Sequence, residues 1–110
     1  MTLLSRTEEM LLLMVCKLQD EAYGMQIRNE VKSLTGKLYS IGGIYVPLDR
    51  LVAKGFLEMQ DIEASGDRLG RPRRRFTITA EGIQVLKETR QIEQSMWELP
   101  DAVMKKMKLA

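Results

Sequence analysis

The chain has 110 residues with one cysteine and no histidine, which excludes a disulfide within the chain, the common zinc sites and histidine-based catalytic triads. Its hydrophobic fraction of 45% and charged fraction of 29% are ordinary for one soluble globular domain, and we expect neither a metal nor a cofactor. The net charge of +2 hides an uneven distribution. Residues 37–75 hold 8 basic and 5 acidic side chains, and this local excess of +3 favours a polyanionic partner.

The sequence shows no segment that would cross or enter a membrane. The longest apolar run, residues 10–15, is far shorter than the roughly 20 residues of a transmembrane helix. The N-terminus lacks the basic region and long apolar stretch of a secretory signal, so we expect a cytoplasmic protein without membrane contact. Cys16 lies in an apolar run and is interpreted as a buried structural residue, with a redox-sensing thiol as the alternative.

A first helix is predicted for residues 5–19. Ser5 and Glu8 have the spacing of a capping box at its start. The helix is then apolar nearly all the way round, whereas a surface helix of a small monomer carries a single apolar stripe. We therefore expect neighbours on two sides, the second being another subunit. The residues assigned to a dimer interface from this helix are Leu11, Met14 and Val15.

A second helix is predicted from about residue 24 to residue 34, with Gly36 as its C-cap. The central helix follows within residues 39–55, capped by Ser40 and closed by Gly55 in a left-handed conformation. Its apolar stripe, typical of one helix face, consists of Ile44, Leu48, Leu51 and Val52.

Pro47 conflicts with a regular helix in this segment, because proline has no N–H and suits only a first helical turn. Either the regular helix begins near Val46, or its first turn is distorted around Gly42 and Gly43. We favour the second interpretation, since Ile44 fits the apolar stripe.

The second half of the chain predicts two strands and one long helix. Residues 56–62 alternate as a strand, residues 63–73 form a loop with two glycines and a proline, and residues 74–78 return as the second strand. Thr79 caps a final helix that runs from Ala80 to about residue 99, and the last ten residues form a short amphipathic turn or fray.

This order of elements predicts a mainly α-helical fold with a small β-hairpin, a winged helix-turn-helix with one helix appended. The expected domains are a winged helix-turn-helix over residues 1–79 and a dimerisation helix with its tail over residues 80–110, both within one structural unit.

With these residues placed, residues 3–88 resemble the PadR family of transcriptional regulators. The resemblance rests on the apolar first helix and on the order and spacing of four motifs: Tyr23-Gly24; Gly43-Ile44-Tyr45-Val46-Pro47-Leu48 with Leu51 and Gly55; Gly70-Arg71-Pro72-Arg73-Arg74; and Thr79-Ala80-Glu81-Gly82. It implies a dimeric DNA-binding repressor whose last helix crosses to the partner's first helix. The family pattern also has a proline in the recognition helix, and the short region after Gly82 resembles a compact subgroup.

Candidate DNA contacts come from the wing, the recognition helix and the start of the second helix. The predicted set is Tyr23, Lys37, Ser40, Gly42, Gly43, Tyr45, Arg50, Arg68, Arg71 and Arg73. The alternative for the arginine run is a solvated charge cluster, and Ser40 is equally explained as a cap alone. Tyr45 is either half core or a groove contact, and Arg50 beside Asp49 is either a groove contact or an ordinary surface pair.

The final helix carries the remaining candidates. Its predicted dimer contacts are Ile83, Leu86, Ile92, Met96 and Trp97. For Trp97 the alternatives are dimer core or a stacking wall for a small aromatic effector, with Met96 and Ile92 beside it.

The leading hypothesis is a homodimeric repressor that binds a pseudo-palindromic operator in double-stranded DNA and is released by an unidentified effector. The alternative is a winged-helix module that binds another protein and not DNA. No catalytic residue is nominated, because no acid pair has a recognisable catalytic spacing and no glycine-rich phosphate loop is present, and we do not expect an enzyme.

Overall fold

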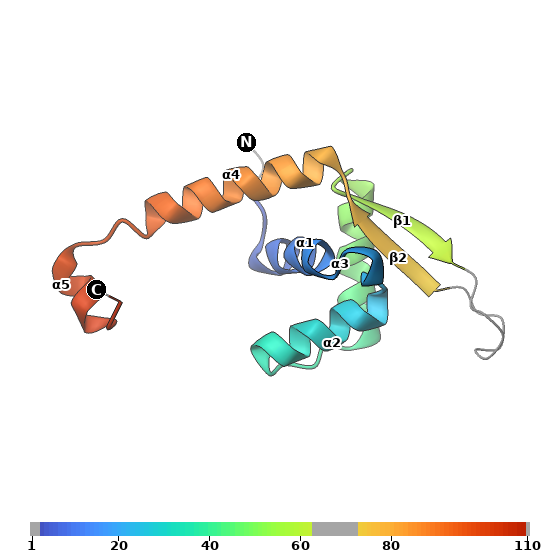
Figure 1. The fold of residues 1–110 in the computed structure, drawn as a ribbon, viewed down its shortest axis with the longest axis horizontal. Helices are drawn as coiled ribbons and strands as arrows, with labels where there is room; N and C mark the ends of the chain where they lie inside the picture. Colours follow the sequence, from blue (N-terminus) through green and yellow to red (C-terminus); the bar gives the residue numbers. More distant parts are fainter. Residues whose placement is uncertain (1–2, 63–72, 110) are drawn as a thin grey trace.

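A computed structural model describes residues 3–62 and 73–109, in which three helices precede a β-hairpin and two helices follow it (Figure 1). The elements are α1 (Arg6–Leu18), a 3-10 turn η1 (Gln19–Glu21), α2 (Gly24–Thr35), α3 (Ile41–Ala53), β1 (Leu57–Ile62), β2 (Arg73–Ile78), α4 (Ala80–Met96) and α5 (Asp101–Lys106). This is the winged helix-turn-helix that the sequence predicted.

Local capping residues set the ends of the first helices. The Ser5 hydroxyl accepts a hydrogen bond from the Glu8 N–H, and the Glu8 carboxylate accepts one from the Ser5 N–H, which completes the predicted capping box. Glu8 also pairs with Lys54 at the end of α3, so one carboxylate ties two helices together. Helix α2 ends at Gly36, whose φ of 76° is the left-handed conformation predicted for it.

The recognition helix α3 begins at Ile41, so it does not start near Val46. Residues 41–53 form one uninterrupted α-helix, and the distorted first turn that we favoured around Gly42 and Gly43 is not observed. The Ser40 hydroxyl caps it by accepting a hydrogen bond from the Gly43 N–H at 2.9 Å. Pro47 lies inside the helix, where it cannot donate to the carbonyl of Gly43. The helix closes at Gly55, with a φ of 83° and the paired backbone hydrogen bonds of a Schellman motif.

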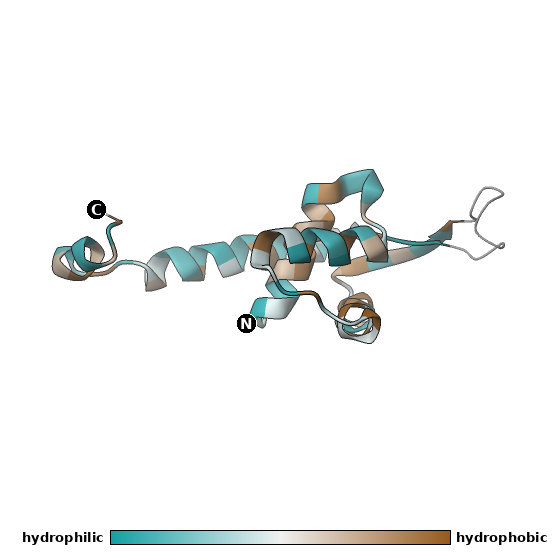
Figure 2. Cartoon of the chain, turned by 90° about the horizontal axis from the view of Figure 1, so that it is seen from below, coloured by the Kyte–Doolittle hydropathy of each residue, from teal (hydrophilic) through white to brown (hydrophobic). Residues whose placement is uncertain are grey.

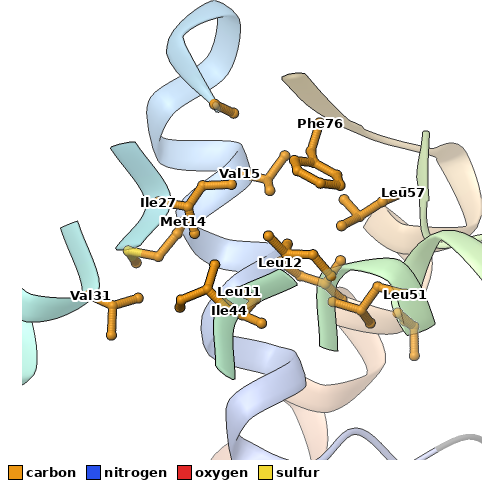
Figure 3. Close-up of a cluster of buried hydrophobic side chains, with 13 residues drawn as sticks. Leu11, Leu12, Met14, Val15, Ile27, Val31, Ile44, Leu51, Leu57 and Phe76 are labelled. Carbon is orange, nitrogen blue, oxygen red and sulfur yellow. The ribbon is translucent and has the colours of Figure 1, made fainter. Parts of the chain in front are cut away.

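The core is built around α1, as Figure 3 shows. Side chains from α2 and α3 cover one side of this helix, and β2 and α4 pack against the other. The buried set is Leu11, Leu12, Met14, Val15, Ala22, Ile27, Val31, Ile44, Leu48, Leu51, Leu57, Phe76 and Val85.

This packing corrects the dimer-interface assignment for α1. Leu11, Met14 and Val15 are 0%, 7% and 2% exposed, so they are occupied within their own protomer. The helix is apolar nearly all round because elements of the same chain cover both of its sides. Its outward apolar residue is Leu13, which is 44% exposed.

The hairpin is antiparallel, with Leu57 opposite Ile78 at its base and Ile62 opposite Arg73 toward the wing. The segment before α2 adds a short third pairing to β2. The Phe76 N–H donates to the Ala22 carbonyl at 2.9 Å, and Tyr23 forms a bridge with Arg75. The wing is therefore fixed to the start of α2.

Helix α4 extends away from this core, as Figure 1 shows. The Thr79 hydroxyl accepts from the Gly82 N–H at 3.0 Å and donates to the Gly55 carbonyl at 2.6 Å, which sets the direction of the helix. The radius of gyration is 16.6 Å, compared with about 13 Å for a compact chain of this size.

Helix α4 ends at Met96, three residues before the predicted end, and α5 forms in the tail. None of the helices described here is both long and apolar enough to span a membrane.

Candidate nucleic-acid interface

Helix α2 carries no acidic side chain in its first turn, where Tyr23 is half-buried and Gly24 is buried. Tyr23 occupies the cap position without a side-chain capping bond, so the cap residue leaves the first N–H groups of the helix without a side-chain acceptor. Such groups, together with the helix dipole, form a favourable environment for a phosphate. The sequence predicted Tyr23 for this role, and the structure places it at this helix terminus.

Tyr45 of the recognition helix reaches the same place. Its ring and hydroxyl lie directly against the Cα of Gly24, where any β-carbon would collide with them. The residue is half-buried, which agrees with the prediction that its ring would be partly in the core. Gly24 thus lets the recognition helix approach the first turn of α2.

Arg73 brings a positive charge to this site from the wing. Its guanidinium carbon lies 3.7 Å from the centre of the Tyr23 ring, in a cation–π contact. The side chain is half-buried and is held over the ring instead of extending into solvent. Tyr23, Gly24, Tyr45 and Arg73 therefore converge, although they come from three separate elements.

The next two arginines have other partners. Arg74 lies 3.6 Å from Asp49 on α3 and 3.6 Å from Asp61 on β1. It therefore compensates Asp49, the acidic residue of the recognition helix, although all three side chains are too exposed for a strong ion pair. Arg75 donates to the Gln60 side chain at 3.2 Å.

The remaining predicted contacts lie on α3, just before it or in the wing, and those on α3 are exposed or half-buried. Gly42 faces open space, and Gly43 lies beside the Ser40 hydroxyl that caps the helix. Arg50 is exposed. Lys37 lies before the helix with its ammonium 4.6 Å from the centre of the Tyr39 ring. Arg68 and Arg71, predicted at the wing tip, lie outside the described residues.

Three residues of this surface were not among the predicted contacts. Ile41 and Val46 are 57% and 50% exposed on α3, where apolar groups suit contact with thymine methyl groups. Ile41 was missed because its spacing from Ile44 matches the core stripe. Arg28 donates to the Tyr39 carbonyl at 2.6 Å and so holds the turn between α2 and α3, a contact between segments that no local pattern reveals.

The predicted dimer contacts of α4 are unevenly covered. Leu86 packs against the core and Ile92 is half-buried, whereas Ile83, Met96 and Trp97 are 56%, 63% and 53% exposed. After Val85, no residue of the described chain is buried. Large apolar side chains on an uncovered helix indicate a surface that another molecule covers.

Two further observations concern a redox role for Cys16 and metal binding. Burial raises the pKa of the Cys16 thiol, which favours the structural interpretation of this cysteine over a redox-sensing one. Within residues 3–62 and 73–109, no group of three or more candidate metal ligands is present.

Comparison with known families decides where this fold belongs. The model of the PadR-like family of transcriptional regulators matches residues 12–88, more than half of the chain. The chain belongs to this family. PadR-like proteins are transcriptional regulators and not enzymes, in agreement with the sequence analysis. A comparison with curated protein sequences gave no match.

Solved structures show the same fold. A PadR-like transcription factor from Bacteroides fragilis is 26% identical, with a TM-score of 0.63 and coverage of 89% of each chain. A PadR-like regulator from Bacillus cereus is 20% identical, with a TM-score of 0.62 and coverage of 91% of each. A transcriptional regulator from Clostridium thermocellum is 21% identical, with a TM-score of 0.58, covering 94% of this chain and 97% of that one.

Proposed function

We propose that this PadR-family chain is a homodimeric repressor that binds a pseudo-palindromic operator in double-stranded DNA. The observation that carries the proposal is that Tyr23, Tyr45 and Arg73 meet at the uncapped N-terminus of α2, beside the recognition helix. One phosphate there would meet the helix N–H groups, the Tyr45 hydroxyl and the Arg73 guanidinium. It would fix the register in which α3 enters the major groove.

On this proposal the exposed residues of α3 read base edges in the groove. Ser40, Gly42, Gly43 and Arg50 lie on or near its exposed side, and the two glycines allow close approach of the backbone. The wing arginines, with Arg68 and Arg71 at the predicted tip, contact the flanking phosphates or minor groove. Lys37 adds a further backbone contact before the helix.

The uncovered half of α4 supports the dimer. Met96 and Trp97 are exposed and Ile92 is half-buried, and the same surface of a second copy would cover them. Two recognition helices related by this axis would enter successive major grooves about 34 Å apart. An effector would act by changing that separation, and Trp97, Met96 and Ile92 are the proposed contacts for a small aromatic one.

Binding of the purified protein to the DNA upstream of its own coding sequence, over a salt series, tests the proposal. The variant is Arg73→Ala, and Arg6→Ala is the matched control because Arg6 lies on α1, with a side chain 86% exposed and away from the wing. We expect promoter-selective binding that weakens steeply with salt. Loss of one phosphate contact in Arg73→Ala should reduce the slope of log K against log salt by about 0.9, with the Arg6→Ala slope unchanged.

Two results would count against this proposal. Equal binding to every DNA tested would reduce the site to a non-specific basic surface. Absence of binding at low salt would favour the alternative of a winged-helix module that binds another protein.

A further inference from the structure

The recognition helix α3 carries one large apolar side chain on the face opposite the core. Its buried residues are Ile44, Leu48 and Leu51. With 3.6 residues per turn, the opposite face consists of the exposed residues Gly42, Val46, Asp49 and Ala53. Val46 is 50% exposed, whereas Gly42 and Ala53 are small. Within α3, which is described in full, Val46 is therefore the large apolar group directed away from the core.

The polar side chains of α3 include none of the type that reads adenine. Asparagine and glutamine pair with adenine through two hydrogen bonds, and neither occurs in the helix sequence IGGIYVPLDRLVA. Arg50 is of the type that pairs with guanine, and Asp49, an acceptor for cytosine, lies 3.6 Å from Arg74. An A·T pair can still be recognised by its other base, because thymine presents a C5 methyl group in the major groove.

Two apolar residues of α3 are exposed, and their positions on the helix distinguish them. Ile41 precedes Ile44 by three residues and Leu48 by seven, so it lies beside the core stripe although it is 57% exposed. Val46 lies on the opposite side, where the helix would face the base pairs. Val46 is therefore the better candidate for contact with a thymine methyl group.

We propose that Val46 determines specificity for an A·T pair by covering the C5 methyl group of one thymine in each half-site of the operator. The inference rests on the DNA binding of the proposed function and adds the base that the recognition helix reads. Two local features suit Val46 to this contact. One turn earlier, Gly42 has no side chain to hold the helix away from the base edges. A valine in a helix also has one strongly preferred rotamer, so its methyl groups lose little freedom on contact.

DNA that contains uracil in place of thymine tests the contact, because uracil forms the same base pair and lacks only the methyl group. The fragment upstream of the coding sequence is amplified with dTTP or with dUTP, and fluorescence anisotropy gives the affinity of the natural protein for each. Covering one methyl group corresponds to about 0.8 kcal/mol, or roughly fourfold in affinity. With two half-sites, the affinity for the uracil fragment should be lower by about 15-fold.

The variant Val46→Ala removes the proposed contact. It should fold normally, because Val46 is exposed and alanine favours helix. The ratio of its affinities for thymine and uracil DNA should be close to one. The matched control is Leu109→Ala, which shortens a side chain 57% exposed in the C-terminal tail and should keep the ratio of the natural protein. This end of the chain lies far from the hairpin in both views of the molecule (Figure 1 and Figure 2).

Fragments with uracil at one position at a time then locate the base. The loss of affinity that Val46→Ala abolishes should map to one thymine in each half-site. The two positions should be related by the symmetry of the operator, each with a loss of roughly fourfold in the natural protein.

The inference is overturned if the natural protein binds its promoter selectively but with equal affinity for thymine and uracil DNA. The proposed function would then stand, and α3 would read other bases. A Val46→Ala variant that keeps the ratio of the natural protein overturns it too, because the methyl sensitivity would come from another contact or from DNA shape. Failure of the natural protein to distinguish its promoter from unrelated DNA would refute the proposed function, and the inference with it.

Discussion

The Tyr45 ring and hydroxyl lie against the Cα of Gly24, so the recognition helix and the first turn of α2 meet at a position that accepts only glycine without rearrangement. The contact places the Tyr45 side chain against the residue that follows Tyr23, and the Tyr23 ring has the Arg73 guanidinium carbon 3.7 Å from its centre. It is the point at which the two helices of the helix-turn-helix and the wing are brought to one site.

Gly24→Ala should therefore reduce DNA affinity by more than the addition of one small methyl group would suggest. The new methyl group would displace the Tyr45 side chain from the α2 N-terminus, removing its hydroxyl from the proposed phosphate site. We expect a loss of DNA affinity similar to that in Tyr45→Ala, and little further loss in the double variant, because both changes remove the same contact. Fluorescence anisotropy with labelled operator DNA measures each affinity.

For stability alone, Gly42→Ala is the control for the glycine substitution, since Gly42 is itself a proposed DNA contact and its DNA affinity is not a control. Apart from its chain neighbours and the backbone of its own helix, no atom lies within 4 Å of a β-carbon placed at Gly42, and alanine favours helix by roughly 0.5–1 kcal/mol over glycine. The free energy of unfolding should rise in Gly42→Ala and fall in Gly24→Ala. Equal DNA affinity of Gly24→Ala and the natural protein would show that Tyr45 does not act through this contact.

Gly82→Ala should destabilise the fold by a different route. A β-carbon at Gly82 would collide with the backbone carbonyl of Phe56, and a backbone atom cannot turn aside as a side chain can. Overpacking of this kind typically costs about 1–3 kcal/mol. Urea denaturation followed by circular dichroism measures the change, and an unchanged midpoint would mean that α4 shifts freely on the hairpin.

The contrast between these glycines shows what the sequence could and could not predict. Ser5, Gly36 and Gly55 act on neighbouring backbone, and their roles were read correctly because capping depends on residues a few positions away. The requirement for glycine at 24 and 82 depends on Tyr45 and Phe56, which the fold brings from distant segments.

The same reasoning explains the error in the dimer interface. An apolar run such as that of α1 shows that both sides of a helix are covered, but not by which chain. Here α2, α3, β2 and α4 of the same protomer cover them, which buries Leu11 and Val15. Tyr23, Tyr45 and Arg73 were each predicted as DNA contacts, whereas their convergence required the register of the hairpin.

Asp49→Asn should strengthen DNA binding. Asp49 is an acidic residue on the recognition helix, and Arg74 lies between it and Asp61. Removing the carboxylate reduces repulsion of phosphates and leaves Arg74 with one acidic partner in place of two. If Arg74 then takes a phosphate, the salt slope should become steeper by about 0.9.

Glu58→Gln serves as the control, since Glu58 is an exposed acid on β1 outside the Arg74 pairs. A loss of affinity in Asp49→Asn for operator DNA alone would contradict the prediction. It would indicate that Asp49 accepts a hydrogen bond from a cytosine amino group and contributes to sequence reading.

Glu9→Gln should stabilise the protein at neutral pH. A hydrogen bond with the Glu93 carboxyl, burial and repulsion from that carboxyl together raise the pKa of Glu9 above its ordinary value of 4.5, and Arg6 offsets part of this. A raised pKa means that the folded protein holds the proton more tightly than the unfolded chain. The free energy of unfolding therefore falls as the pH rises from about 4.5 through the pKa of folded Glu9.

Glutamine keeps a hydrogen-bond donor toward Glu93 and removes the half-buried charge. The variant should thus be more stable than the natural protein near pH 7, and the difference should vanish below the ordinary pKa of glutamate. Thermal unfolding at several pH values measures this, with the exposed Glu98→Gln as a control that should show no such pH dependence. A variant less stable than the natural protein at pH 7 would contradict the prediction. It would mean that the ion pair of Arg6 with the Glu9 carboxylate outweighs the repulsion between Glu9 and Glu93.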